Sequence, residues 1–127
     1  MTIERMHVRK RLSQVVVHGD TIYLAGIVTD EPVPDDPAEQ TRNILAKIDG
    51  FLREAGSDRA HMLSATIWLS DIAHYDAMNS VWDPWVPDGC APARACVESR
   101  LAAPKYKVEI RITAAKATPA HTGTGMA

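Results

Sequence analysis

The sequence predicts one α+β domain in which two helices cover one face of a β-sheet. Its patterned segments follow in the order strand, strand, helix, strand, helix, strand, strand. With 127 residues, the chain is long enough for one substantial core but short for two domains. Hydrophobic residues make up 46% of the chain and charged residues 24%, which is typical of soluble globular proteins.

The N-terminal part predicts a short opening strand at residues 3–5, followed by a β-hairpin. Two runs rich in β-branched residues, Ser13–His18 and residues 21–25, are separated by a two-residue Gly-Asp turn. Gly26 then ends the second strand of the hairpin. A glycine at this point indicates that another backbone or a ligand comes close to the chain.

The first helix is predicted from its start signals. Residues 29–37 hold three prolines and four acidic residues, which indicates a loop. Asp36 is a suitable N-cap, Pro37 suits the first helical position, and Glu39 is placed to complete a capping box. Apolar residues then recur at helical spacing until Gly56, so the helix is amphipathic and covers the sheet.

A third strand and a second helix follow. Met62–Leu69 is apolar enough to predict a strand that is buried on both faces. Asp71 is a suitable cap for a helix over residues 72–85, and Pro84 is expected to disturb its last turn.

Residues 91–115 predict two more strands, joined by a short basic connection that contains a proline. Arg94 stands at the start of the first strand and Glu109 lies within the second, so the two charges are expected to meet across the sheet. There, Arg94 would bind a planar carboxylate through two parallel hydrogen bonds, and Glu109 would hold or deprotonate a water. An ordinary cross-strand ion pair is the alternative interpretation.

Composition argues against several classes of protein. A formal net charge of -2 and a pI near 6.2 provide no basic surface for nucleic acid. The chain has no apolar run of membrane-spanning length, and its first residues lack the apolar segment of a signal peptide, so a soluble cytoplasmic protein is expected. Cys90 and Cys96 form no CxxC motif, and the five histidines show no metal-binding spacing, so neither a disulfide nor a metal is expected.

The strands carry apolar residues on both faces, while two helices cover only one. Val15, Val17 and Ile22 alternate with Val16 and Tyr23, which point to the other side. Burial of that second face against another subunit is the expected solution, so we expect an oligomer.

An ordered set of segments, spread over residues 3–115, resembles the RidA/YjgF family and most closely its YoaB-like branch. The segments are SQVVV (13–17), YLAG (23–26), the helix at 40–56, ATIWL (65–69), AMN (77–79), residues 82–85, APAR (91–94) and PKYKVEI (104–110).

The resemblance implies a chorismate-mutase-like fold and a homotrimeric barrel with clefts at the subunit boundaries. It also implies hydrolysis of reactive 2-enamino or 2-imino acids to 2-keto acids and ammonia, without a metal or an organic cofactor. Residues 1–116 would form the family domain, and residues 117–127 a flexible tail.

The resemblance also implies roles for five residues. Arg94 matches an arginine that binds the substrate carboxylate, and Glu109 matches an acid that positions the attacking water. Cys96 matches a position whose backbone contacts the substrate nitrogen. Asn79 matches an asparagine near the cleft, and Gly26 matches a glycine whose backbone lines it.

Leu12 is a departure from the family pattern. It stands where the deaminase branch has a tyrosine that reaches the cleft, so a hydroxyl is replaced by an apolar wall. This leaves a second functional hypothesis open: a trimeric small-carboxylate-binding or regulatory protein with little or no catalysis.

Overall fold

The structure is a computed structural model that describes residues 1–117. Of the tail expected at residues 117–127, all but the first residue lies outside the described part of the chain. The described residues form six strands and two α-helices. In order, they are β1 (Ile3–Val8), β2 (Ser13–His18), β3 (Thr21–Leu24), α1 (Pro37–Glu54), β4 (Met62–Leu69), α2 (Tyr75–Trp85), β5 (Ala93–Glu98) and β6 (Val108–Ala115). Two short 3-10 helices, η1 (Arg59–His61) and η2 (Ile72–His74), precede β4 and α2.

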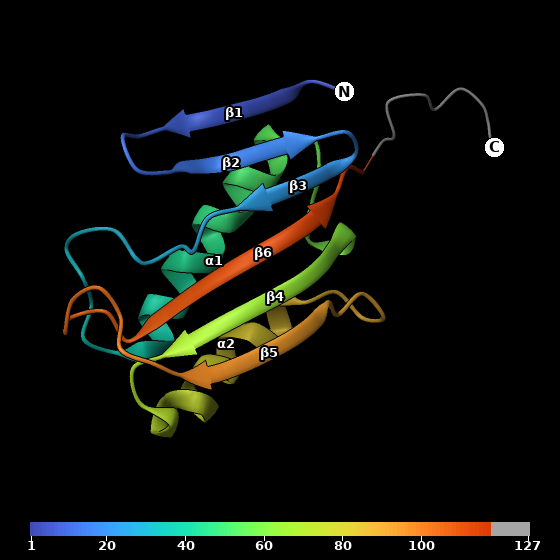
Figure 1. Cartoon of the computed structure of the whole chain (residues 1–127). Coiled ribbons are helices and arrows are strands. Elements are labelled where there is room, and N and C mark those ends of the chain that lie inside the picture. The colour runs from blue at the N-terminus through green and yellow to red at the C-terminus, as the bar shows by residue number, and fades with distance from the viewer. Residues whose placement is uncertain (118–127) are drawn as a thin grey trace.

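The strands form one mixed sheet in the order β1-β2-β3-β6-β4-β5. Only β4 and β5 are parallel, and all other neighbours are antiparallel. Both helices pack on the same face of the sheet, behind the strands in Figure 1. The predicted α+β architecture with two helices on one face of the sheet is therefore confirmed.

Helix α1 begins as its sequence predicts. The Asp36 carboxylate accepts a hydrogen bond from Ala38 N at 2.9 Å, and Pro37 occupies the first turn. Gly56, with φ of +85°, follows the C-cap and ends the helix. Glu39 does not take the predicted capping role, because its carboxylate pairs with Arg42 one turn further along.

The core is formed by the helix-facing sides of the central strands. Ala65, Ile67 and Leu69 on β4 are buried, as are Ile110 and Ile112 on β6. The alternating residues on β4 are only partly covered, so the prediction that this strand is buried on both faces is wrong for a single chain. The physical reason is that both helices lie on the same side.

Two element boundaries differ from those predicted. β1 continues to Val8, which pairs with Ser13, and a turn closed by Arg9 N and Leu12 O at 2.7 Å joins the two strands. The Asp71 side chain caps η2, and α2 itself begins at Tyr75. Pro84 lies in the last turn of α2, one residue before the helix ends.

We call the sheet surface away from the helices the open face. The register places Val16 and Tyr23 opposite each other on this face, and Trp68 opposite Val97. Tyr23 is 41% exposed and Val97 is 45% exposed. Large apolar side chains in such positions are typical of surfaces that another molecule covers.

Gln40 joins the start of α1 to the segment before β6. The side chain is completely buried, and its Nε2 donates to Pro34 O at 2.8 Å and to Lys105 O at 3.0 Å. Its Oε1 accepts from Lys107 N at 2.9 Å. One amide therefore satisfies three backbone groups that come from two different loops.

We expect Gln40→Leu to lower the free energy of unfolding by about 2 kcal/mol, because buried backbone groups lose their partners. Urea denaturation followed by circular dichroism measures this change. The exposed Arg42→Gln variant on the same helix should stay within roughly 0.5 kcal/mol of the native chain. Equal stability of the two variants would show that the Gln40 bonds contribute little.

Candidate functional site

Arg94 is the second residue of β5, and its partly buried side chain lies on the helix-facing side. Its Nη1 donates to Asn79 Oδ1 at 2.8 Å, and its Nη2 donates to the Tyr75 hydroxyl at 3.3 Å. The guanidinium carbon lies 5.5 Å from the centre of the Trp82 ring and 5.8 Å from the centre of the Tyr75 ring. Helix α2 therefore orients the arginine through one amide and two aromatic rings.

Within residues 1–117, Arg94 forms no ion pair with an acidic side chain. Asn79 and Tyr75 engage two of its five N–H donors, which leaves donors for an external group. A fixed guanidinium without a protein carboxylate is suited to bind a planar anion by two parallel hydrogen bonds.

Glu109 lies on β6, opposite Trp68, and its side chain is on the open face. A Cβ atom added at Gly26 would lie 2.1 Å from Glu109 Oε2, so only glycine leaves room for the carboxylate in its present position. Burial raises the pKa of the Glu109 carboxyl above its usual value. The carboxyl therefore holds its proton more readily than an exposed glutamate does.

The expectation that Arg94 and Glu109 meet across the sheet is wrong for one chain. β4 lies between β5 and β6, where Arg94 pairs with Ala65 and Glu109 pairs with Trp68. The register offset of three residues and two strands separates the two backbone positions by roughly 14 Å. Their side chains also lie on opposite faces of the sheet.

Cys96 lies two residues after Arg94 on the same side of β5. It pairs with Ile67 and packs against the core. Burial raises the pKa of the Cys96 thiol, although the charge of Arg94 acts in the opposite direction. The side chain is therefore a neutral packing group rather than a thiolate, and the backbone of Cys96 lies on an edge strand of the sheet.

Leu12 closes the turn before β2 and is 47% exposed. It lies at the end of the sheet where β3 ends, because Gln14 O accepts a hydrogen bond from Ala25 N at 3.0 Å. The predicted site residues therefore form two groups. We call Arg94, Asn79 and Cys96 the arginine half-site, and Glu109, Gly26 and Leu12 the glutamate half-site.

Sequence reasoning missed the contribution of two aromatic residues to the arginine half-site. Trp82 is buried in the core, and its ring also covers Arg94. The hydroxyl and ring of Tyr75 contact the same guanidinium. Tyr75, Asn79 and Trp82 are spaced by four and three residues, which places them on one helical face, and this spacing was the available signal.

Within residues 1–117, no group of three or more His, Cys, Asp or Glu side chains is arranged to hold a metal ion. None of the helices in this part of the chain has the length and apolar character needed to cross a membrane.

The mixed six-stranded sheet with two helices on one face places the protein in the α+β class. The family model described as Endoribonuclease L-PSP matches residues 2–116. The chain belongs to this family.

Relatives agree with this assignment over nearly the whole chain. The RutC family protein YoaB of Escherichia coli is 47% identical over 115 residues, covering 91% of this chain and 99% of the relative. The structure is similar to that of a YjgF family member from Neisseria meningitidis, with a TM-score of 0.88, 48% identity, and coverage of 91% and 96%. A putative translation initiation inhibitor from Salmonella typhimurium gives a TM-score of 0.81 at 46% identity, with coverage of 90% and 97%.

The raised pKa of Glu109 predicts a pH-dependent change in stability. Because the folded chain favours the neutral carboxyl, ionisation above the usual value of 4.5 lowers stability. Glu109→Gln should therefore be more stable than the native chain at pH 7, and this advantage should shrink as the pH falls through the raised pKa. Urea denaturation at pH 7 and pH 4 measures the difference.

The matched control is Glu4→Gln on the exposed β1 strand, which should show no such trend. A stabilisation by Glu109→Gln of the same size at both pH values would mean that ionisation of Glu109 is not its cause.

Proposed function

We propose that the chain hydrolyses 2-imino and 2-enamino acids to 2-keto acids and ammonia, without a cofactor, at a site between the subunits of a homotrimer. The observation that carries the proposal is the arrangement of Arg94, a fixed guanidinium without an acidic partner in residues 1–117. The family match adds support, because sites of related chains are expected to share their geometry.

Arg94 binds the substrate carboxylate in this proposal. Two parallel N–H···O bonds fix the plane of the carboxylate and therefore the position of the adjacent imine carbon. Asn79 and the rings of Tyr75 and Trp82 hold the guanidinium before the substrate arrives, so little ordering is needed on binding.

Glu109 acts on water. The imine reacts in its protonated form: the Glu109 carboxylate accepts a proton from water as the water oxygen bonds to the imine carbon, and the C=N π electrons move onto the nitrogen. Glu109 then returns this proton to the nitrogen of the carbinolamine, and the C–N bond breaks to release ammonia. The hydroxyl becomes the keto group as its proton passes to the Glu109 carboxylate. A pKa raised by burial suits a group that must both accept and return a proton.

Two subunits are needed because Arg94 and Glu109 lie on opposite faces of one sheet. An arrangement in which the β5 edge of one subunit meets the open face of the next brings an arginine half-site to a glutamate half-site. The exposed Tyr23 and Val97 are consistent with such a contact.

Leu12 supports a second candidate function. The glutamate half-site has an apolar side chain where a hydroxyl is expected, and it is 47% exposed. Under this alternative the trimer binds a small carboxylate at Arg94 and catalyses little or no hydrolysis.

The description of the matched family names an endoribonuclease. A formal net charge of -2 offers little overall attraction for RNA. A half-buried arginine that faces aromatic rings suits a small planar anion better than a phosphate backbone. The proposal therefore favours an imino-acid substrate.

A coupled assay tests the proposal. An amino-acid oxidase generates a 2-imino acid, and the release of the keto acid is followed over time. The native chain should accelerate release, and Arg94→Ala should lower kcat/KM by roughly 100-fold, equivalent to about 3 kcal/mol of lost transition-state stabilisation. The exposed Arg53→Ala variant should behave like the native chain. If the native chain gives no acceleration, the hydrolase proposal is wrong.

Mixed trimers test whether the site lies between subunits. Arg94→Ala and Glu109→Gln chains, unfolded together and refolded, should regain about a quarter of native activity, because that fraction of interfaces joins two intact half-sites. Complete inactivity of the mixture, with normal trimer formation, would place both groups in one chain and contradict the arrangement.

The binding alternative gives a different result in the same proteins. Pyruvate, a 2-keto acid, should raise the Tm of the native chain and of Glu109→Gln but not that of Arg94→Ala, while the native chain shows no hydrolysis. Hydrolysis by the native chain would exclude the alternative.

A further inference from the structure

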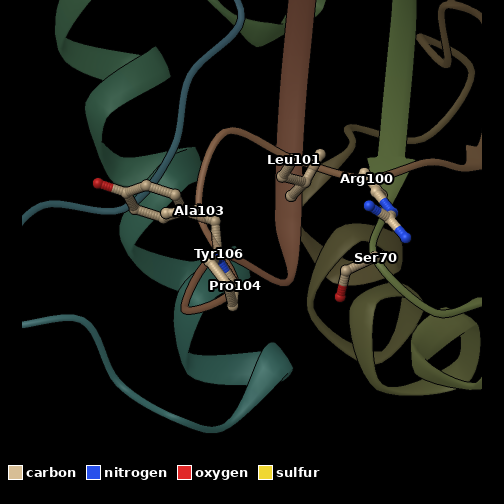
Figure 2. Close-up of a pocket in the computed structure, with 6 residues that line it drawn as sticks. All are labelled: Ser70, Arg100, Leu101, Ala103, Pro104 and Tyr106. Carbon is tan, nitrogen blue, oxygen red and sulfur yellow. The ribbon is translucent and has the colours of Figure 1, made fainter.

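A hollow of about 380 Å³ lies where β4 and β5 end and where the chain turns back towards β6. Its volume is in the range of sites that bind small molecules. Six residues line it, and Figure 2 draws all of them: Ser70, Arg100, Leu101, Ala103, Pro104 and Tyr106. The arginine half-site contributes none of these residues.

Backbone hydrogen bonds hold the walls of this hollow. Ser99 N donates to Leu69 O at 2.9 Å, Ser70 N donates to Lys107 O at 3.0 Å, and Tyr106 N donates to Ala103 O at 3.1 Å. The buried Gln40 side chain fixes the same connection from the helix side, through Lys105 O and Lys107 N. The hollow is therefore formed before any ligand binds.

The connection between β5 and β6 carries three basic residues, and they differ in their partners. Lys105 pairs with Glu31, and Lys107 pairs with Asp35 at 3.2 Å. Within residues 1–117, Arg100 has neither an ion pair nor a hydrogen bond from its guanidinium. It is the uncompensated positive charge of this connection.

The acidic residue closest to Arg100 in the sequence is already engaged. Glu98 Oε1 accepts a hydrogen bond from Ile72 N at 2.8 Å, at the start of η2. Like the Arg100 guanidinium, the Ser70 hydroxyl has no hydrogen-bond partner in the described part of the chain. Two polar groups at the hollow are therefore open to a ligand.

The polar and apolar residues lie on different sides of the hollow. Figure 2 shows Arg100 and Ser70 on one side, and Ala103, Pro104 and Tyr106 on the other. The Leu101 side chain lies between the two groups in this view. This arrangement suits a molecule with a negative group at one end and an apolar body at the other.

We propose that this hollow is a second binding site, which takes a small amphipathic carboxylate. The guanidinium of Arg100 and the hydroxyl of Ser70 bind the carboxylate, and the hydrocarbon body packs against Leu101 and Pro104. A charged donor provides strength, and the apolar wall selects against small polar anions.

The site is separate from Arg94 in the chain. Arg94 lies near the start of β5, and Arg100 lies two residues beyond its end. Six residues of extended chain span roughly 20 Å. A ligand that fills the hollow does not reach both arginines of one chain. The proposal therefore stands or falls independently of the hydrolysis assigned to the two half-sites.

Titration of the full ¹⁵N-labelled chain with 3-phenylpropanoate, followed by amide chemical shifts, tests the proposal. We expect saturable shifts at Ser70 and across residues 99–107, in the native chain and in Arg94→Ala alike. Arg100→Gln should weaken binding by about 10-fold or more, because a charge-assisted pair is lost. Arg100 is exposed, so an unchanged Tm is expected for this variant.

Two controls separate the carboxylate contact from apolar adsorption. Arg53→Gln, which changes another exposed arginine, should bind like the native chain. The neutral analogue 3-phenylpropanamide should bind as weakly to the native chain as the carboxylate binds to Arg100→Gln. Absence of saturable shifts in the native chain, equal affinity in Arg100→Gln, or loss of binding in Arg94→Ala would each overturn the proposal.

Discussion

The structure depends on one constraint: α1 and α2 bury only one face of a six-stranded sheet. The helix-facing sides of β4 and β6 supply much of the apolar core, including Ile67, Ile110 and Ile112. Because side chains alternate along a strand, every second residue is directed to the open face. The same alternation places Glu109 on the open face, while Arg94 pairs with the buried Ala65 and lies under α2.

This separation matters for the electrostatics of the site. If Arg94 and Glu109 were in contact, the arginine would lower the pKa of the glutamate, and the glutamate would occupy the guanidinium that is proposed to bind an anion. Held apart, Arg94 has only neutral partners in Asn79 and the aromatic rings, and Glu109 responds to burial alone. Each half-site is therefore incomplete in the single chain, which is why a composite site between subunits is the proposed arrangement.

The connection from β5 to β6 is a second organised region. Acidic residues of the loop before α1 neutralise Lys105 and Lys107, and the buried Gln40 binds backbone groups on the same connection. These contacts shape a hollow, and of the three basic residues of this connection they leave Arg100 without a partner within residues 1–117. The short basic connection predicted from the sequence is thus held in place by the buried side chain of Gln40.

Local signals in the sequence determined most element positions. Asp36 and Pro37 mark the start of α1, and the β-branched run of β2 and the apolar run of β4 were predicted with their observed bounds. These signals act over a few residues, through capping geometry and side-chain alternation. The β1 edge strand was predicted too short because its exposed residues carry no apolar pattern. Arg94 and Asn79, both selected from the sequence, are in contact in the structure.

Only the tertiary structure decided how these residues are grouped. Strand order is a long-range property: β4 separates β5 from β6, although β5 and β6 follow each other in the chain. Because of this strand order, Glu109 lies away from Arg94. The arginine instead contacts Tyr75 and Trp82 of α2. Which face a side chain takes depends on where the helices pack, and a residue's neighbours depend on register. Neither is encoded in the spacing of two charged residues along one stretch of sequence.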